Sequence, residues 1–598
     1  MPRTQRTRLN GVLVVLTAAG ALAACGGGSG ATGKGPSAAS ERAITGKAGG
    51  AGCMAPSTAE PMSKGGAGST LALAKVGGRR VAFVADEDAK ALLTIDLDSQ
   101  SQLAETRLEG TPAQVWVAAD GRVFTTLRDK SELVALAVSR PDAPLTRLCS
   151  ATTPAEPIAI AATPDESTIL VSSGWGQRLA AFEAASLAAK FEAKLPREPR
   201  AVVVADDGKT AFVSHAVGSV VSVVDLAGAK HESRPLPMRG IEAQQLRALA
   251  KQRAMLEQMA KRTASGSNEM LAALEEQTRR LERQSCQGFA LAKSSAVSGR
   301  IFAPQVMVDP GDLDQRPDGY GDEHSPTETP AVAVIDETAQ TPLLASVTLR
   351  RDPLVFLNRG DTREARAECL LPRAAVVDTK TRSLLVTCYG IDADTEKHRA
   401  VVWSQSDRTI STFPIGESEL VDEKVSPLTV QKTAAAPLRE KLPAEYALGR
   451  ILFHATGDAR ISADGRACAS CHPDGRDDAI TWATPEGPRR SIMLAGRAAP
   501  TPPYSWNGNE TSLHGHLANT FDRLSGKGLR SIELDALVTY VSQMPAPPRA
   551  APADNAKIDR GRAIFASSEA GCSTCHSGAT FTDGRNHDVG SKHRADRG

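Results

Sequence analysis

The chain has 598 residues, and its 70 lysines and arginines almost balance its 69 aspartates and glutamates, which leaves a net charge of +1. A nucleic-acid-binding protein would carry a strongly basic surface, so this balance favours neither that class nor an acidic interaction tail. After the N-terminal segment, no uninterrupted run of about 18 apolar residues follows, and the sequence predicts no membrane-spanning helix there.

The first 25 residues have the order of a secretory signal peptide. Arginines precede a short apolar run that begins at Gly11 and ends in small residues, and the run is too short to span a membrane. Leu22 to Cys25 resemble a bacterial lipobox, whose cysteine carries lipid after cleavage; an ordinary signal-peptidase site is the alternative. We therefore expect a signal over 1–25, lipidation at Cys25, and attachment to a bacterial membrane in the periplasm or at the cell surface.

Residues 26–70 are rich in Gly, Ala and Ser and poor in large apolar side chains. Such a segment buries too little apolar surface to offset the entropy of folding, so we expect a disordered tether.

Three similar segments then recur at 112–121, 157–165 and 199–208, with starts 45 and 42 residues apart, and a fourth copy is present at 372–378. Each is a period-2 apolar strand, and in the first three a turn of the Asp-Gly or Pro-Asp type follows. A repeat of 40 to 45 residues with four short strands is typical of a propeller blade. The region 71–433 resembles bacterial surface propellers of the YVTN type, which implies about seven blades; a β-sandwich is the alternative fold.

A helical insertion interrupts the repeats at 240–285. Residues 240–263 and 268–285 are rich in helix formers with leucines at helical spacing, and Gly266 separates them, which predicts a helical hairpin. This hairpin would either bind a partner or pack against the rest of the same chain. The acidic stretch 309–328 offers oxygen donors for calcium but lacks an EF-hand order, so a solvated loop is the preferred interpretation.

Two Cys-x-x-Cys-His motifs lie near the end of the chain, at 468–472 and 572–576. This spacing is what covalent attachment of c-type haem requires. The site residues of the first motif would be Cys468, Cys471 and the iron ligand His472. Those of the second would be Cys572, Cys575 and the iron ligand His576. A zinc knuckle would need another Cys/His pair nearby, which neither motif has, and a thioredoxin-like redox pair is the other alternative.

Five of the ten cysteines remain after Cys25 and the four in these motifs: Cys53, Cys149, Cys286, Cys369 and Cys388. In an oxidising periplasm some of them are expected to pair, and an odd number leaves at least one over. The sequence does not say which.

Each motif follows a Gly-Arg-x-x-Phe segment, at 449–453 and 561–565, which indicates an internal duplication. We therefore expect two all-α cytochrome c-type domains, at 444–544 and 553–598. Residues 446–598 resemble the diheme cytochrome c peroxidase family, which includes the methylamine-utilisation diheme enzymes. The motifs that carry the resemblance lie at 448–453, 468–472, 487–490, 503–508, 572–576 and 587–590.

The resemblance implies two covalently bound haem c groups, with Trp506 placed between them on an electron path; a core tryptophan beside the porphyrin is the alternative. The chain departs from the family at the distal site. The segment 478–482 has no histidine, no catalytic glutamate is recognisable in 512–528, and Arg490-Ser491 replaces an asparagine near the family's calcium site. These departures put peroxide chemistry in doubt.

The sixth ligand of the first iron is open among four side chains: His514, His516, Met493 and Met544. We favour His516, because Met544 ends a helix at 532–543 and is expected to lie too far along the fold. Only 22 residues follow His576, so we expect a truncated second domain, with His587 or His593 as ligands by default. The alternative is a second haem that is left half-covered.

These inferences predict a multidomain protein, a propeller followed by cytochrome c-type domains. The expected function is that of a lipid-anchored diheme cytochrome that transfers electrons to or from a periplasmic partner. The alternative is a peroxidase-type oxidoreductase that reduces hydrogen peroxide or oxidises a propeller-bound substrate. A surface adhesion protein is a third possibility, which the two complete haem motifs disfavour.

Overall fold

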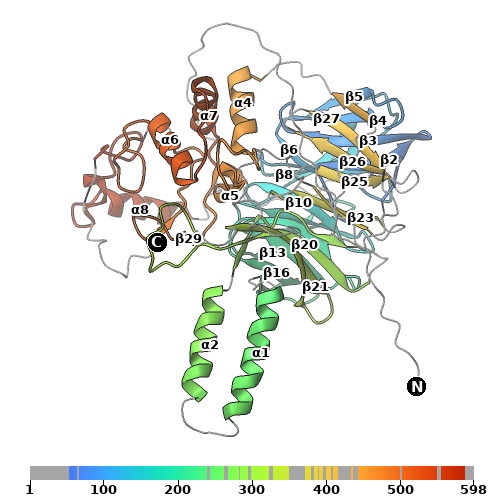
Figure 1. Ribbon diagram of the computed structural model, residues 1–598. Helices are drawn as coiled ribbons and strands as arrows, with labels where there is room; N and C mark the ends of the chain where they lie inside the picture. The colour runs from blue at the N-terminus through green and yellow to red at the C-terminus, as the bar shows by residue number, and fades with distance from the viewer. Residues whose placement is uncertain are drawn as a thin grey trace.

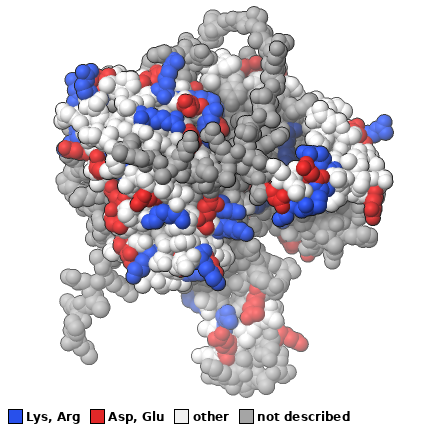
Figure 2. Space-filling view, turned by 180° about the vertical axis from the view of Figure 1, so that it is seen from behind, with Lys and Arg blue, Asp and Glu red and all other residues white. Residues whose placement is uncertain are grey.

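The computed structural model describes residues 53–63, 66–238, 243–260, 267–281, 283–293, 298–321, 327–348, 371–378, 383–387, 390–394, 399–405, 408–414, 432–435, 442–498, 501–548, 554–585 and 587. They form a ring of β-sheets with a helical region beside it (Figure 1). The face shown in Figure 2 intersperses cationic and anionic side chains, in line with the near-zero net charge of the sequence.

Seven antiparallel sheets follow one another along the described chain, and we number them as blades in that order. Blade 1 holds β1 (Ala59–Pro61), β2 (Leu71–Val76), β3 (Arg79–Asp86), β4 (Ala91–Asp96) and β5 (Gln102–Arg107). Blade 2 holds β6 (Pro112–Val117), β7 (Val123–Leu127), β8 (Glu132–Ala137) and β9 (Thr146–Thr152). Blade 3 holds β10 (Pro157–Ala162), β11 (Thr168–Ser173), β12 (Arg178–Glu183) and β13 (Ala189–Lys194). Blade 4 holds β14 (Pro199–Val204), β15 (Thr210–His215), β16 (Val220–Asp225) and β17 (Ser233–Pro237).

The remaining blades are less regular. Blade 5 holds β18 (Gln284–Cys286), β19 (Ala292–Lys293), β20 (Arg300–Val308), β21 (Glu328–Asp336) and β22 (Thr341–Thr348). Blade 6 holds β23 (Ala374–Asp378) and β24 (Ser383–Thr387), and blade 7 holds β25 (Gly390–Asp394), β26 (Arg399–Ser404), β27 (Thr409–Pro414) and β28 (Lys432–Ala435).

Apolar cores between successive blades close the ring. The pairs of buried residues that bridge blades 1 to 6 in order are Phe83 with Val134, Phe124 with Phe182, Leu179 with Val213, Phe212 with Ile301, and Phe302 with Val386. Strand β23 contacts β25, which joins blades 6 and 7. Leu73 of blade 1 packs in one cluster with Trp403 of blade 7. Each sheet therefore buries both faces against its neighbours, and the fold is a β-propeller rather than a sandwich.

The propeller begins earlier in the chain than the composition predicted. Residues 26–70 were expected to be disordered, but Cys53 forms a disulfide with Cys149 of blade 2. Strand β1 pairs with β2, and Ser69 exchanges backbone hydrogen bonds with Val115. The disulfide and the backbone hydrogen bonds hold this segment in place, and neither can be predicted from composition alone. Residues 1–52, with the signal and Cys25, lie outside the described residues.

The predicted helical hairpin is present as α1 (Ala243–Ala260) and α2 (Ser267–Leu281), which extend side by side away from the ring between blades 4 and 5 (Figure 1). Leu249 and Leu274 are its buried leucines among the side chains described. Within the described part of the chain, none of the helices has the length and apolar character that crossing a membrane requires.

The helical region beside the ring holds α4 (Ala444–Phe453), α5 (Cys468–Cys471), α6 (Leu513–Arg523), α7 (Ser531–Gln543) and α8 (Asn555–Ala566), with the 3-10 turns η3 (Pro473–Gly475) and η4 (Cys572–Thr574). It is not purely helical as expected, since β29 (Thr481–Trp482) pairs with β30 (Arg489–Arg490). Helices α4, α6 and α7 share a core that includes Phe453, Phe521 and Leu537. Helix α8, in contrast, buries none of its residues.

Candidate functional site

The first Cys-x-x-Cys-His motif is one turn of helix. Cys468 and Cys471 are the first and last residues of α5, so the two side chains lie one turn apart. His472 caps the turn, and its backbone N–H donates to the Cys468 carbonyl oxygen at 2.9 Å. Both cysteines are free and half-buried. Burial raises the pKa of Cys468 to about 12, which argues against a thioredoxin-like pair, because redox-active cysteines have lowered pKa values.

The His472 ring is held by a backbone carbonyl. Its Nδ1 lies 3.3 Å from the Arg476 carbonyl oxygen. An imidazole whose Nδ1–H donates to a carbonyl presents Nε2 to a metal. Burial lowers the pKa of His472 to about 4, and the charge of nearby His516 contributes to the lowering. The ring is therefore neutral at physiological pH, which is the form that ligates iron.

The second motif repeats this local geometry. The His576 backbone N–H donates to the Cys572 carbonyl oxygen, again at 2.9 Å, and His576 Nδ1 lies 3.2 Å from the Phe581 carbonyl oxygen. The surroundings differ, because Cys572 and Cys575 are followed by an exposed His576. The two motifs thus have the same turn geometry but differ in how deeply they are buried. Nearby His587 pairs with Asp583 at 2.8 Å, and His593 lies outside the described residues.

Of the candidate sixth ligands, His516 lines a pocket, whereas His514 is exposed on the surface. His514 pairs on the surface with Asp535 at 2.9 Å. His516 lines a pocket of about 290 Å³ together with Trp506, Tyr320 and Glu510.

Met544 is closer to the first motif than its position in the chain suggested. A Cβ on Gly475 would lie 2.7 Å from the Met544 sulfur, so the expectation that Met544 lies too far along the fold is wrong. Helix α7 packs along α4, and its end returns to the loop that follows His472. Met493 is a partly buried member of the same apolar core.

Trp506 lies in the same pocket as His516. Its indole N–H donates to the Arg490 carbonyl oxygen at 3.0 Å, and its ring meets Tyr320 edge-on with centroids 5.9 Å apart. The segment that carries it also approaches the second motif's region, where a Cβ on Gly584 would lie 3.6 Å from the Pro502 carbonyl oxygen.

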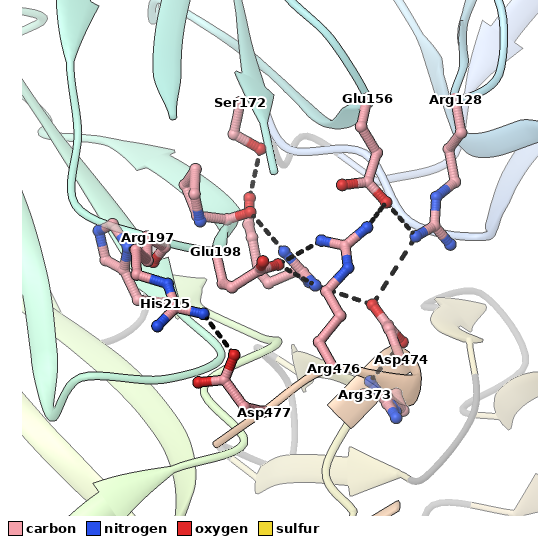
Figure 3. Close-up of polar contacts among 12 residues, drawn as sticks. Arg128, Glu156, Ser172, Arg197, Glu198, His215, Arg373, Asp474, Arg476 and Asp477 are labelled. Carbon is pink, nitrogen blue, oxygen red and sulfur yellow. Dashed lines mark hydrogen bonds and ion pairs between the residues drawn. The ribbon is translucent and has the colours of Figure 1, made fainter. Parts of the chain in front are cut away.

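The loop after His472 inserts into a cluster of charges on the propeller (Figure 3). Arg476 lies between two buried carboxylates and contacts Glu156 at 2.6 Å and Glu198 at 2.5 Å. Asp474 faces three guanidinium groups, those of Arg200 at 2.8 Å, Arg373 at 3.5 Å and Arg128 at 3.7 Å. We call these seven residues the interface ion network: Arg128, Glu156, Glu198, Arg200, Arg373, Asp474 and Arg476.

The network holds its carboxylates ionised despite their burial. Glu156 is only 2% exposed. Burial alone would raise its pKa, but the guanidinium groups of Arg128 and then Arg476 lower it to about 2. In the same way, burial opposes the ionisation of Asp474, while Arg200 and Arg373 keep its pKa well below the usual range. Because each buried charge is neutralised by its partners, removal of any one partner should lower the stability of the folded protein.

Further contacts fix α5 and its neighbours on the ring. The Gln287 side-chain N–H donates to the carbonyl oxygens of Ala469 at 2.9 Å and Ser470 at 3.0 Å. Arg450 of α4 forms a two-pronged contact with Asp88 of blade 1, at 2.8 and 3.0 Å. The propeller thus meets the helical region that carries the two Cys-x-x-Cys-His motifs, here called the haem-motif region, through buried and partly buried polar groups.

Part of the acidic stretch 309–328 belongs to this interface and is not a solvated loop. The Ala483 N–H donates to the Pro310 carbonyl oxygen at 2.8 Å, and the Gly321 N–H donates to the Ala483 carbonyl oxygen at 3.1 Å. Glu328, at the end of the stretch, accepts from the Ser470 hydroxyl at 3.0 Å, and burial raises its pKa to about 8. As for the doubtful calcium site, the described residues contain no group of three or more His, Cys, Asp or Glu arranged to hold a metal ion.

Sequence reasoning missed the ion network, although a signal was present. Glu156 and Glu198 each stand directly before the proline that opens a repeated strand, at Pro157 and Pro199. A charge repeated at the start of the innermost strands would converge near the middle of a ring. Cys286, one of the unassigned cysteines, is buried in a cluster with Cys471, and Cys369 and Cys388 lie outside the described residues.

Comparison with known proteins adds no functional assignment. No protein family and no curated protein matches the chain. Similar solved structures include hydrazine synthase of Kuenenia stuttgartiensis (11% identity, TM-score 0.34, 59% of this chain and 83% of that chain). A virginiamycin B lyase of Staphylococcus aureus (11%, 0.29, 59% and 85%) and a putative 6-phosphogluconolactonase of Bacteroides fragilis (11%, 0.30, 64% and 85%) are further examples. Likeness at this level carries no argument about function, and the propeller rests on the seven sheets themselves.

Proposed function

We propose that the protein is a diheme c-type cytochrome that transfers electrons to or from a periplasmic partner. The observation that carries the proposal is the shared geometry of the two motifs. In both, the histidine N–H closes the turn on the first cysteine, and the histidine Nδ1 lies within 3.3 Å of a backbone carbonyl oxygen. Covalent haem attachment needs two thiols and a neighbouring Nε2, and a histidine whose Nδ1 is taken up by a carbonyl would leave Nε2 for the iron.

Residues at each motif would hold a haem in the proposed function. At the first, Cys468 and Cys471 would form the thioethers, His472 would ligate the iron, and His516 is the proposed sixth ligand. Haem would supply an iron that cycles between its ferrous and ferric states, and the chain would hold, orient and cover it.

At the second motif, large apolar side chains are exposed, including Ile564 at 63% and Phe581 at 62%. The Phe565 and Phe581 rings lie 5.8 Å apart beside His576. An apolar porphyrin attached at Cys572 and Cys575 would cover such a surface, which a soluble protein otherwise seldom leaves open.

The test is to mature the protein in a bacterial periplasm with a working haem-attachment system. We expect a Soret band, a pyridine haemochrome spectrum and an intact mass for two haems per chain. Replacing Cys468 and Cys471 by Ala should remove one haem, whereas Cys286→Ala, a matched buried thiol in the same cluster, should keep both. Protein with no Soret band and with all four motif thiols free to alkylate would refute the proposal.

We also propose export and lipid anchoring at Cys25. The Cys53–Cys149 disulfide supports an oxidising compartment, because such bonds are rare in the cytosol. Radiolabelled palmitate should label the wild type but not Cys25→Ala, and that variant should move from the membrane fraction to the soluble fraction. Equal labelling of both would contradict the anchor.

A peroxidase-type activity is the second candidate, and the pocket at His516 favours it. Glu510 lines that pocket, and it lies just before the stretch in which the sequence showed no catalytic glutamate. A carboxylate there is placed to move protons to and from a small substrate such as hydrogen peroxide. Peroxide turnover that is lost in Glu510→Gln, together with a high-spin iron signal, would favour this candidate over electron transfer alone.

A further inference from the structure

Arg476 takes part in two contacts that link the propeller to the first motif. Its backbone carbonyl oxygen lies 3.3 Å from Nδ1 of His472. Its guanidinium group is held between Glu156 of the loop before blade 3 and Glu198 of the loop before blade 4. One residue thus joins the hydrogen bond of a proposed iron ligand to two carboxylates that lie 320 and 278 positions away in the chain.

The loop that carries Arg476 is clamped on both sides of that residue. Asp474 contacts Arg200 at 2.8 Å, and Asp477 contacts Arg197 at 2.7 Å. Between them, Arg476 is 4% exposed. The position of its carbonyl therefore depends on these propeller contacts as well as on the turn η3, in which the Arg476 N–H donates to the Pro473 carbonyl oxygen at 2.9 Å.

We propose that Glu156 and Glu198 are positioning residues for His472: by holding Arg476 they fix the acceptor of the ligand's Nδ1–H, and the propeller thereby sets the reduction potential of the first haem. The inference rests on the proposed function, because it assigns a regulator to the same haem site.

The chemistry gives the direction of the effect. A hydrogen bond from Nδ1–H to a fixed carbonyl makes the imidazole a stronger electron donor to iron, which stabilises the ferric state and lowers the potential. If the carbonyl is released, the bond weakens and the potential rises. The second motif provides an internal comparison, because the acceptor for His576 is Phe581 of its own unit.

The experiment compares the haem-loaded wild type with Glu156→Gln/Glu198→Gln by spectroelectrochemical titration. Each is titrated as the full two-haem protein and in a Cys572→Ala/Cys575→Ala background that retains the first haem alone. We expect the first haem's reduction equilibrium to shift about tenfold toward the ferrous form, which is 59 mV for one electron, while the second haem is unchanged. The matched control is Glu132→Gln, which alters a partly exposed pair with Arg147 at the edge of blade 2 and should shift neither haem.

A second variant keeps the test decisive if the double variant does not fold. Asp477→Asn removes the partly exposed pair with Arg197 and loosens the same loop from its outer side, so a smaller shift in the same direction is expected. An unchanged first potential in Asp477→Asn and in any folded Glu156→Gln/Glu198→Gln protein, or equal shifts of both haems, would overturn the inference while leaving the proposed function intact. A wild-type protein that carries no haem would instead refute the proposed function.

Discussion

Replacing Arg476 by Met should destabilise the junction between the propeller and the haem-motif region by about 3 kcal/mol. The change leaves Glu156 and Glu198 facing each other without the cation between them. The pKa of Glu156 is about 2, against an ordinary value of 4.5. Each pKa unit is worth about 1.4 kcal/mol, so the cations outweigh burial and leave a net preference of about 3 kcal/mol for the ionised carboxylate. Loss of one partner from a buried ion pair costs about 3 to 5 kcal/mol, which agrees with that value.

The assay is denaturant unfolding followed by tryptophan fluorescence, because the Arg476 guanidinium lies 5.3 Å from the centre of the Trp175 ring. Since the pKa of Glu156 in the folded state lies below its ordinary value, the stabilisation is present above about pH 4.5 and is lost as the pH falls toward 2. The difference between wild type and variant should therefore be full at pH 7 and shrink in acid. Arg147→Met, in a partly exposed pair with Glu132, should cost less than about 1 kcal/mol. Equal losses in the two variants would refute the reasoning.

Three further predictions concern the disulfide, one glycine and the distal ligand. Cys53→Ala/Cys149→Ala removes a bond that spans 96 residues and should lower the free energy of unfolding by about 4 to 5 kcal/mol; an equal midpoint with and without reductant in the wild type would contradict this. Gly475 has φ 72° and would place a Cβ 2.7 Å from a sulfur, so Gly475→Ala should cost about 1 to 3 kcal/mol in the same assay, and a neutral effect would count against this packing. His516→Ala should convert the first haem from low spin to high spin by electron paramagnetic resonance, while His514→Ala should not.

The sequence predicted the features that depend on neighbours in the chain. Blade strands were recognisable because alternation and turn residues recur within each repeat, as in 157–165, and the ring follows from the need to bury both faces of a sheet. The haem motifs and the hairpin insertion are local in the same sense. The order of the segment 53–70 could not be predicted from local sequence, because it comes from a disulfide and from backbone pairs with distant strands.

The interface could not be predicted in the same way. Arg476 and Glu156 are 320 positions apart, and each alone is indistinguishable from an exposed charge in the sequence. Likewise, the acidic stretch 309–328 has the composition of a loop, and only the structure shows that it pairs with Ala483. Contacts between two domains depend on how their surfaces meet, which no local pattern records.

If each motif carries a haem, as proposed, the surroundings of the two motifs predict unequal reduction potentials. Their turns close alike, and the distances from the histidine Nδ1 to its carbonyl, 3.3 and 3.2 Å, are nearly equal, so the difference comes from the surroundings. Burial lowers the pKa of His472 in the first motif to about 4, whereas His576 of the second is exposed. Burial disfavours the more highly charged ferric iron, so a haem at the first motif should have the higher reduction potential. Titration of the two single-haem variants decides this, and a first haem with the lower potential would show that the surroundings described here do not control it.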